Sequence, residues 1–358
     1  MEFNDNSSVN SILSPGFQIN QLFRRSKRRF YIYADNEIHD ILDNLHSLRD
    51  FDTKTSLLLS KKNLSVNGIL FNKYHIRSVN NNNNKHIVIE LKDTTDIYED
   101  IYYDNFPRQA IINSNKNEID INLNINVGYS KEHAKIETEM LAMNIMMYWN
   151  AVSMLFSGIN NTLVHVPNIN IKIKSINIAK ASGIIFPKDL NTLFSIYRSL
   201  KHYFVDNSMS NRSNVDVEIA MTASQICLRG VDNNCNLQGY TLLLTDDNRN
   251  RKYNIAIMNY NMPLLDYAIG ARELAHSLGV KYIEADKECS GIMSRQYRFS
   301  DEQLRWCNES LNDFESTKKF VSSIRGNNVR NKNSRIPLIS SDDEGEELVV
   351  PFDLSHKL

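Results

Sequence analysis

The sequence predicts a mixed α/β fold, in which long helices pack on a mixed, twisted sheet that follows a β-rich N-terminal region. Apolar and polar residues alternate from Glu118 onward, which is typical of a strand. A wide apolar stripe at helical spacing follows between about Lys131 and Ser157, which indicates a long core helix. A second alternating stretch, Asn168 to Ile178, completes a strand–helix–strand unit and places the start of the main domain near residue 116.

Composition limits the class of protein. The chain has 358 residues, of which 42% are hydrophobic and 23% charged, enough for two domains with ordinary cores. Its 41 basic and 42 acidic side chains leave a net charge of −1, so nucleic acid is not an expected partner. No apolar run approaches the roughly 18 residues of a membrane-spanning helix, so no membrane span is expected.

The N-terminus, residues 1–29, is predicted to be disordered and basic. Arg24 to Arg29 form a dense cationic run, which fits a convertase cleavage site, a nuclear-import patch or a solvated segment. No basic and apolar leader is visible, so the chain as it stands predicts an intracellular or virion-associated protein, and a secreted one if a leader is missing. The abundance of Asn, Ile and Lys suggests an AT-rich genome, such as that of a virus or a parasite.

Residues 30–115 are predicted to form a β-rich region. Residues 64–71 and 74–79 indicate a hairpin, and residues 86–91 a third strand. Asn80 to Asn84 are expected to form the loop before that third strand.

The rest of the main domain, 116–322, alternates further elements. Strands are predicted over 215–221 and 253–258, and helices over 189–204 and about 301–320. From residue 323 to 358 periodicity disappears, and basic then acidic residues predict a disordered tail.

A helix that begins near Pro263 carries the most informative residues. Apolar residues recur at three- and four-residue steps along it, and Gly279 suits its end. Arg272 and His276 are four residues apart and therefore share one face, with Glu273 beside them.

This helix resembles the zinc helix of the metzincin metalloproteases, H-E-x-x-H-x-x-G-x-x-H followed by a Met-turn. In register with that motif, the chain has Glu273, His276 and Gly279 in place, and Gly291 to Ser294 resemble the Met-turn. The order of strands, helices and a two-cysteine loop resembles the reprolysin (M12B) type, of the arthropod-venom or thrombospondin-associated kind. Residues 30–115 resemble its β-rich pro-domain.

The resemblance also shows what is missing. It places Arg272 and Tyr282 at two of the three zinc-ligand positions, leaving His276 as the remnant ligand position, Glu273 at the idle general-base position and Met293 in the Met-turn. Arginine cannot ligate a cation, because it offers only donors and stays charged. The resemblance therefore implies a protease fold that has lost its chemistry. We hypothesise that the Arg272 guanidinium takes the vacated metal position and neutralises Glu273, with His276 hydrogen-bonded to backbone.

The four cysteines all lie in the C-terminal part of the chain. Two disulfides are candidates, Cys227–Cys235 and Cys289–Cys307, although the family has more cysteines, so its pairing does not transfer. Buried free thiols in a reducing compartment remain the alternative.

Three functions follow from these observations. The first is a pseudoprotease that binds a protein or peptide in a retained cleft, with no cofactor expected. The alternative is an active zinc endopeptidase with an atypical ligand set of His276, Tyr282 and either Glu284 or Asp286. The third is an intracellular structural or nucleic-acid-associated protein that uses Arg24 to Arg29, which the near-zero net charge disfavours.

Overall fold

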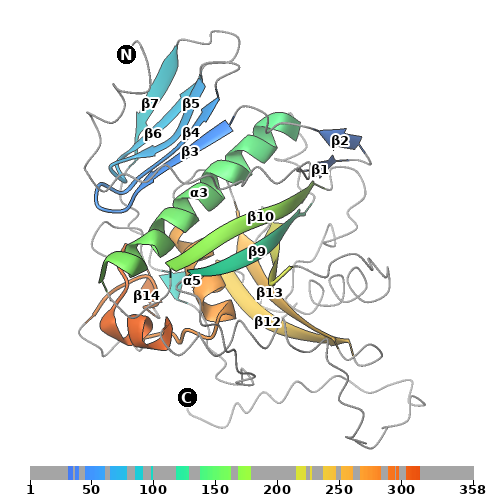
Figure 1. Cartoon of the computed structure of the whole chain (residues 1–358), viewed down its shortest axis with the longest axis vertical. Helices are drawn as coiled ribbons and strands as arrows, with labels where there is room; N and C mark the ends of the chain where they lie inside the picture. The colour runs from blue at the N-terminus through green and yellow to red at the C-terminus, as the bar shows by residue number, and fades with distance from the viewer. Residues whose placement is uncertain are drawn as a thin grey trace, which may run out of the picture. The chain divides into compact units, whose positions relative to one another are not determined.

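The computed structural model shows a mixed α+β fold with two large sheets and few helices (Figure 1). It describes residues 31–34, 37–39, 45–60, 65–78, 85–91, 98–99, 118–128, 138–162, 168–178, 215–222, 226–227, 237–246, 251–260, 267–283, 289–294, 296–297 and 304–314. The predicted helix 189–204, the loop Asn80 to Asn84, the basic run Arg24 to Arg29 and the tail 323–358 lie outside these ranges.

The main sheet has seven strands in the order β12-β13-β11-β9-β10-β1-β2. Its centre is parallel: β9 (Glu118–Val127) pairs with β10 (Asn168–Ile178) and with β11 (Val217–Thr222), which pairs with β13 (Arg251–Asn259). One end is antiparallel, where β12 (Gly239–Asp246) pairs with β13. The strands predicted from the alternating patterns are therefore confirmed, within two residues at either end.

Two N-terminal strands complete the other end of this sheet. β1 (Tyr31–Ala34) pairs in parallel with β10, from Tyr31 opposite Ser175 to Ala34 opposite Ile178. β2 (Glu37–His39) then turns back antiparallel to β1. Residues 30–115 thus contribute strands to both large sheets.

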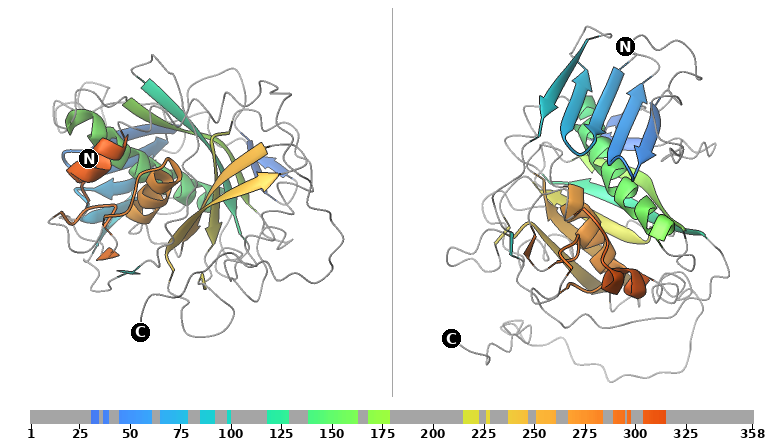
Figure 2. Two further views of the ribbon diagram at one scale, coloured as in Figure 1. Left: turned by 90° about the horizontal axis from the view of Figure 1, so that it is seen from below. Right: turned by 90° about the vertical axis from the view of Figure 1, so that its left-hand side faces the viewer.

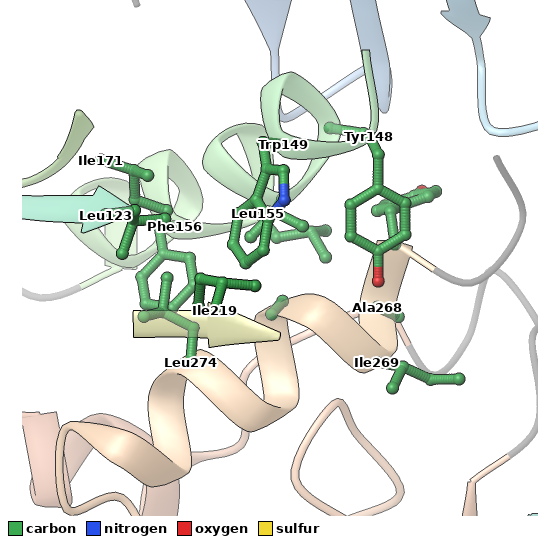
Figure 3. Close-up of a cluster of buried hydrophobic side chains, with 14 of the residues drawn as sticks. Leu123, Tyr148, Trp149, Leu155, Phe156, Ile171, Ile219, Ala268, Ile269 and Leu274 are labelled. Atoms are coloured by element: carbon green, nitrogen blue, oxygen red, sulfur yellow. The ribbon is translucent and has the colours of Figure 1, made fainter. Parts of the chain in front are cut away.

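The long helix α3 (Thr138–Thr162) covers one face of the main sheet and supplies much of the core. Trp149 is fully buried and its Nε1 lies 3.4 Å from Sδ of Met221 on β11. Figure 3 shows side chains from α3, the sheet and α5 in one apolar cluster, among them Leu123, Phe156 and Leu274. The predicted helix began seven residues earlier, at Lys131, but residues 129–137 lie outside the described ranges.

The other face of α3 meets a five-stranded antiparallel sheet, visible in blue in Figure 2. Nδ2 of Asn150 reaches the backbone oxygens of Leu48 and Leu57, and Arg49 donates to Ser153. Burial lowers the pKa of Arg49 to about 10. The strands of this sheet, in order, are β3 (Leu45–Asp50), β4 (Thr55–Ser60), β5 (Ser65–Leu70), β6 (Tyr74–Ser78) and β7 (His86–Glu90).

The polar side chains of β9 are buried in a hydrogen-bonded network. Asn122 donates to Asp216, and Asn124 and Asn126 both donate to Oε2 of Glu218, at 2.6 and 3.1 Å. These groups lie on the opposite face from the apolar residues of β9, which pack in the core. Burial of a carboxylate costs free energy unless hydrogen bonds replace its water, and the asparagines supply them.

A short pair of strands, β8 (Tyr98–Glu99) and β14 (Gln296–Tyr297), stands apart from both large sheets. Residues 308–314 are helical, whereas residues 304–307 are not, so the helix predicted from about residue 301 begins later than expected. Among the described helices, none combines the length and the hydropathy needed to cross a membrane.

Candidate functional site

The candidate site is built on α5 (Tyr267–Ser277), which packs against α3 and against strands β12 and β13. Gly270 allows the close approach to α3, because a Cβ there would lie 2.7 Å from the Tyr148 ring. At the other end, Gly279 adopts a φ of 95°, and its N–H bonds to the His276 oxygen at 2.9 Å. This left-handed exit, favoured by glycine, turns the chain so that Tyr282 returns beside the helix.

Glu273 is completely enclosed. Its side chain is 0% exposed, and its carboxylate accepts hydrogen bonds from the Thr241 hydroxyl at 2.9 Å and from the Tyr282 hydroxyl at 3.1 Å. A Cβ on Gly239 would lie 2.4 Å from Cγ of Glu273, so the carboxylate side chain lies directly on the backbone of β12. Both carboxylate oxygens therefore have a protein donor.

The Tyr282 ring contacts the two other motif residues of α5. The His276 ring stacks on it, with centroids 4.3 Å apart and planes inclined by 22°. Cζ of Arg272 lies 4.5 Å from the centroid of the same ring, within the range of a cation–π interaction. Arg272 is only 2% exposed, so this contact forms away from bulk solvent.

His276 is half-buried and its orientation is fixed by the backbone. Nδ1 lies 2.9 Å from the Val280 oxygen, so Nδ1 carries the proton and donates to that carbonyl. The bond agrees with the expected backbone-bonded histidine, and it leaves Nε2 as the ring's acceptor nitrogen.

Met293 is fully buried in the turn that follows. The Met293 oxygen accepts the Ile283 N–H at 2.7 Å, which ties the turn to the segment carrying Tyr282. Within the turn, the Ser294 hydroxyl oxygen accepts the Gly291 N–H at 2.6 Å.

A disulfide holds the same turn. Cys289 and Cys307 are bonded, with Cα atoms 6.0 Å apart, and Ile292 N–H bonds to the Arg305 oxygen at 3.0 Å. Cys227 is also disulfide-bonded, and its expected partner Cys235 lies outside the described residues.

The donor set does not fit a zinc ion. Structural and catalytic zinc sites use three or four Cys, His or carboxylate ligands. Here His276 offers one nitrogen, Arg272 offers only donors, and the Tyr282 hydroxyl already donates to Glu273. In the described part of the chain, no group of three His, Cys, Asp or Glu side chains converges to hold a metal. Glu284 and Asp286 lie outside those ranges.

Sequence reasoning missed two members of this cluster, Thr241 and Gly239. Both belong to β12, far from α5 in sequence, and only the packing of α5 on that strand brings them to Glu273. A small residue and a hydroxyl residue two positions apart at the start of a strand give no signal of such a role.

No protein-family model and no curated protein matches the sequence. Among solved structures, metalloproteinase-II from Bacteroides fragilis is similar over 88% of this chain and 96% of its own, with 11% identity and a TM-score of 0.44. Archaemetzincin from Methanopyrus kandleri is similar over 57% and 98%, with 14% identity and a TM-score of 0.33. At TM-scores and identities this low, neither likeness supports a conclusion about activity.

Proposed function

We propose that this chain is a metzincin-like protein of the reprolysin type that binds a protein or peptide partner and does not cleave it. The proposal is supported by the order of elements along the chain: strand β9, helix α3, strands β10 to β13, the motif helix α5 and the turn at Met293. That order is the one in which the sequence resembles the reprolysins.

One observation supports the proposal that the chain does not cleave its partner. A general base must present its carboxylate to a water and to the scissile bond. Glu273 instead is fully buried, and the hydroxyls of Thr241 and Tyr282 occupy its two oxygens. With Arg272 and Tyr282 at the lost ligand positions, the described part of the chain provides neither a set of three metal ligands nor an exposed base at position 273.

The experiment uses the purified full chain and fluorescently labelled, unfolded casein as a model of an extended polypeptide. After dialysis against zinc and then against buffer, mass spectrometry is expected to find well under one zinc per chain. Fluorescence anisotropy is expected to rise on binding, while electrophoresis shows the casein intact.

Two results would contradict the proposal. Casein cleavage that is lost both with chelator and in Glu273→Ala would establish the active endopeptidase with an atypical ligand set. Absence of both binding and cleavage would remove the binding role.

A further inference from the structure

Among the described strands, β7 forms an apolar edge of the five-stranded sheet. It is the last strand of the five-stranded sheet in the described part of the chain, and Figure 1 draws it outermost. Ile87, Val88 and Ile89 are 40, 56 and 40% exposed. Three consecutive exposed β-branched residues on an edge strand form a template for pairing with another strand, which proteins normally block with charges, proline or a bulge.

The peptide groups of β7 that face this edge can be identified. β6 and β7 are antiparallel, with Ile76 opposite Val88, and the Leu91 N–H bonds to the Lys73 oxygen at 2.6 Å. In an antiparallel pair, successive residues point their N–H and C=O groups alternately toward and away from the partner. Since Leu91 points toward β6, the peptide groups of His86, Val88 and Glu90 point outward.

The side chains of β7 are symmetric about Val88, with an isoleucine on each side, so an antiparallel copy of the same strand sets isoleucine opposite isoleucine. We propose that β7 pairs antiparallel with β7 of a second copy of this chain, around a two-fold axis at Val88. His86 then lies opposite Glu90 of the second copy and Val88 opposite its own counterpart. Every outward peptide group gains a partner, and the two five-stranded sheets become one continuous sheet.

The side chains favour this register over its neighbours. Ile87 lies opposite Ile89 of the second copy, a β-branched pair of the kind that stabilises antiparallel sheets. No like charges face each other, whereas an axis at Glu90 would set two carboxylates opposite one another. A register shift of one residue would place the outward-pointing peptide groups of one copy opposite inward-pointing ones of the other. A two-fold axis at Ile87 or Ile89 would leave one of the three outward-pointing residues without a counterpart in the second strand.

The test measures self-association of the full chain by sedimentation velocity over a concentration series. The wild type is expected to show a dimer whose fraction rises with concentration. Val88→Lys places two like charges opposite each other at the axis, and we expect its dimer dissociation constant to rise about tenfold or more. Phe71→Lys is the matched control, since Phe71 is equally exposed at 54% but lies in the β5–β6 turn. Its dissociation constant is expected to equal that of the wild type.

Two cysteine variants test the register, because the correct register produces a disulfide-linked dimer that the wild type cannot form. Residues opposite each other as a hydrogen-bonded pair have Cα atoms about 5.5 Å apart, within the range for a disulfide. Val88→Cys is therefore expected to form a covalent dimer under mild oxidation, and Ile87→Cys much less of it. A wild type that stays monomeric, a Val88→Lys dimer as tight as the wild type, or equal crosslinking of both cysteine variants would overturn the proposal. So would a monomer that binds only an extended peptide along β7.

Discussion

The Tyr282 hydroxyl donates a hydrogen bond to Oε1 of Glu273, 3.1 Å away. The bond joins the segment after α5 to the helix itself, across the place where the family resemblance puts a metal. It also makes Tyr282 the residue that Arg272, Glu273 and His276 all contact. Four experiments follow, three from this arrangement and one from the five-stranded sheet.

Removal of that hydroxyl should destabilise the protein. In Tyr282→Phe, a fully buried carboxylate oxygen loses its donor, which costs about 1–3 kcal/mol in the free energy of unfolding. Urea denaturation measures this loss. The control is Tyr74→Phe on β6, a half-buried tyrosine whose ring lies beside the exposed Lys73, where little change is expected. Equal stability of the two variants would contradict a role for the bond.

Gly239→Ala should disturb Glu273 by steric overlap. The new Cβ would lie 2.4 Å from Cγ of Glu273, and overpacking of this kind costs about 1–3 kcal/mol. In a Glu273→Ala background that Cγ is absent, so the cost of Gly239→Ala should largely vanish. This double-mutant cycle isolates the contact, and additive effects of the two substitutions would refute it.

Restoring the two missing imidazoles should restore metal binding. Cζ of Arg272 lies 4.5 Å and the His276 ring centroid 4.3 Å from the centroid of the Tyr282 ring, so histidines at 272 and 282 would bring three imidazoles close together. The double variant Arg272→His/Tyr282→His is expected to retain about one zinc per chain, as three histidines do in catalytic zinc sites. Each single variant is the control and should hold much less. Stoichiometric zinc in the wild type would contradict the prediction.

The five-stranded sheet should weaken as pH falls. Burial lowers the pKa of His75 below the ordinary value, helped by the nearby Arg77, and burial also lowers that of His86. The Nε2 of His86 accepts the Val66 N–H at 3.0 Å, which only the neutral ring can do. The unfolded chain then binds more protons than the folded one, so stability is full above about pH 6.5 and is lost as pH falls below it.

The pH effect can be assigned by substitution. The unfolding free energy is measured by urea denaturation from about pH 7.5 to about pH 5. In His86→Gln the side-chain oxygen can still accept the Val66 N–H without titrating, so the pH slope should be smaller. An unchanged slope would show that the sheet's histidines do not cause the effect.

The strands were predictable where one face is apolar and the other polar. The isoleucines and leucine of β9 alternate with asparagines, and the structure has the strand over Glu118–Val127. Sequence alone could not show that Asn124 and Asn126 are buried, because their burial depends on Glu218, which β11 brings alongside. Strand β4 was missed because Leu57, Leu58 and Leu59 form a continuous apolar run without the period of two, and its partner β3 was missed with it.

Of the candidate site, only the three motif residues on one helix could be predicted from the sequence. Helical spacing places Arg272, Glu273 and His276 together, and the structure has them on α5. The hypothesis that Arg272 neutralises Glu273 was based on their neighbouring positions in the sequence. The contacts of Glu273 with Thr241 and Tyr282 arise instead from the packing of α5 against β12 and from the turn at Gly279. Long-range contacts of this kind leave no trace in local periodicity.

The parallel pairing of β1 with β10 has a consequence for how such a protein could mature. In a zymogen, the leading segment is cut away and diffuses off. Here, loss of residues 31–39 would strip two strands from the main sheet and leave the backbone of β10 uncovered, ready to join other chains. A nick after β2 would therefore leave a two-piece molecule whose pieces stay together.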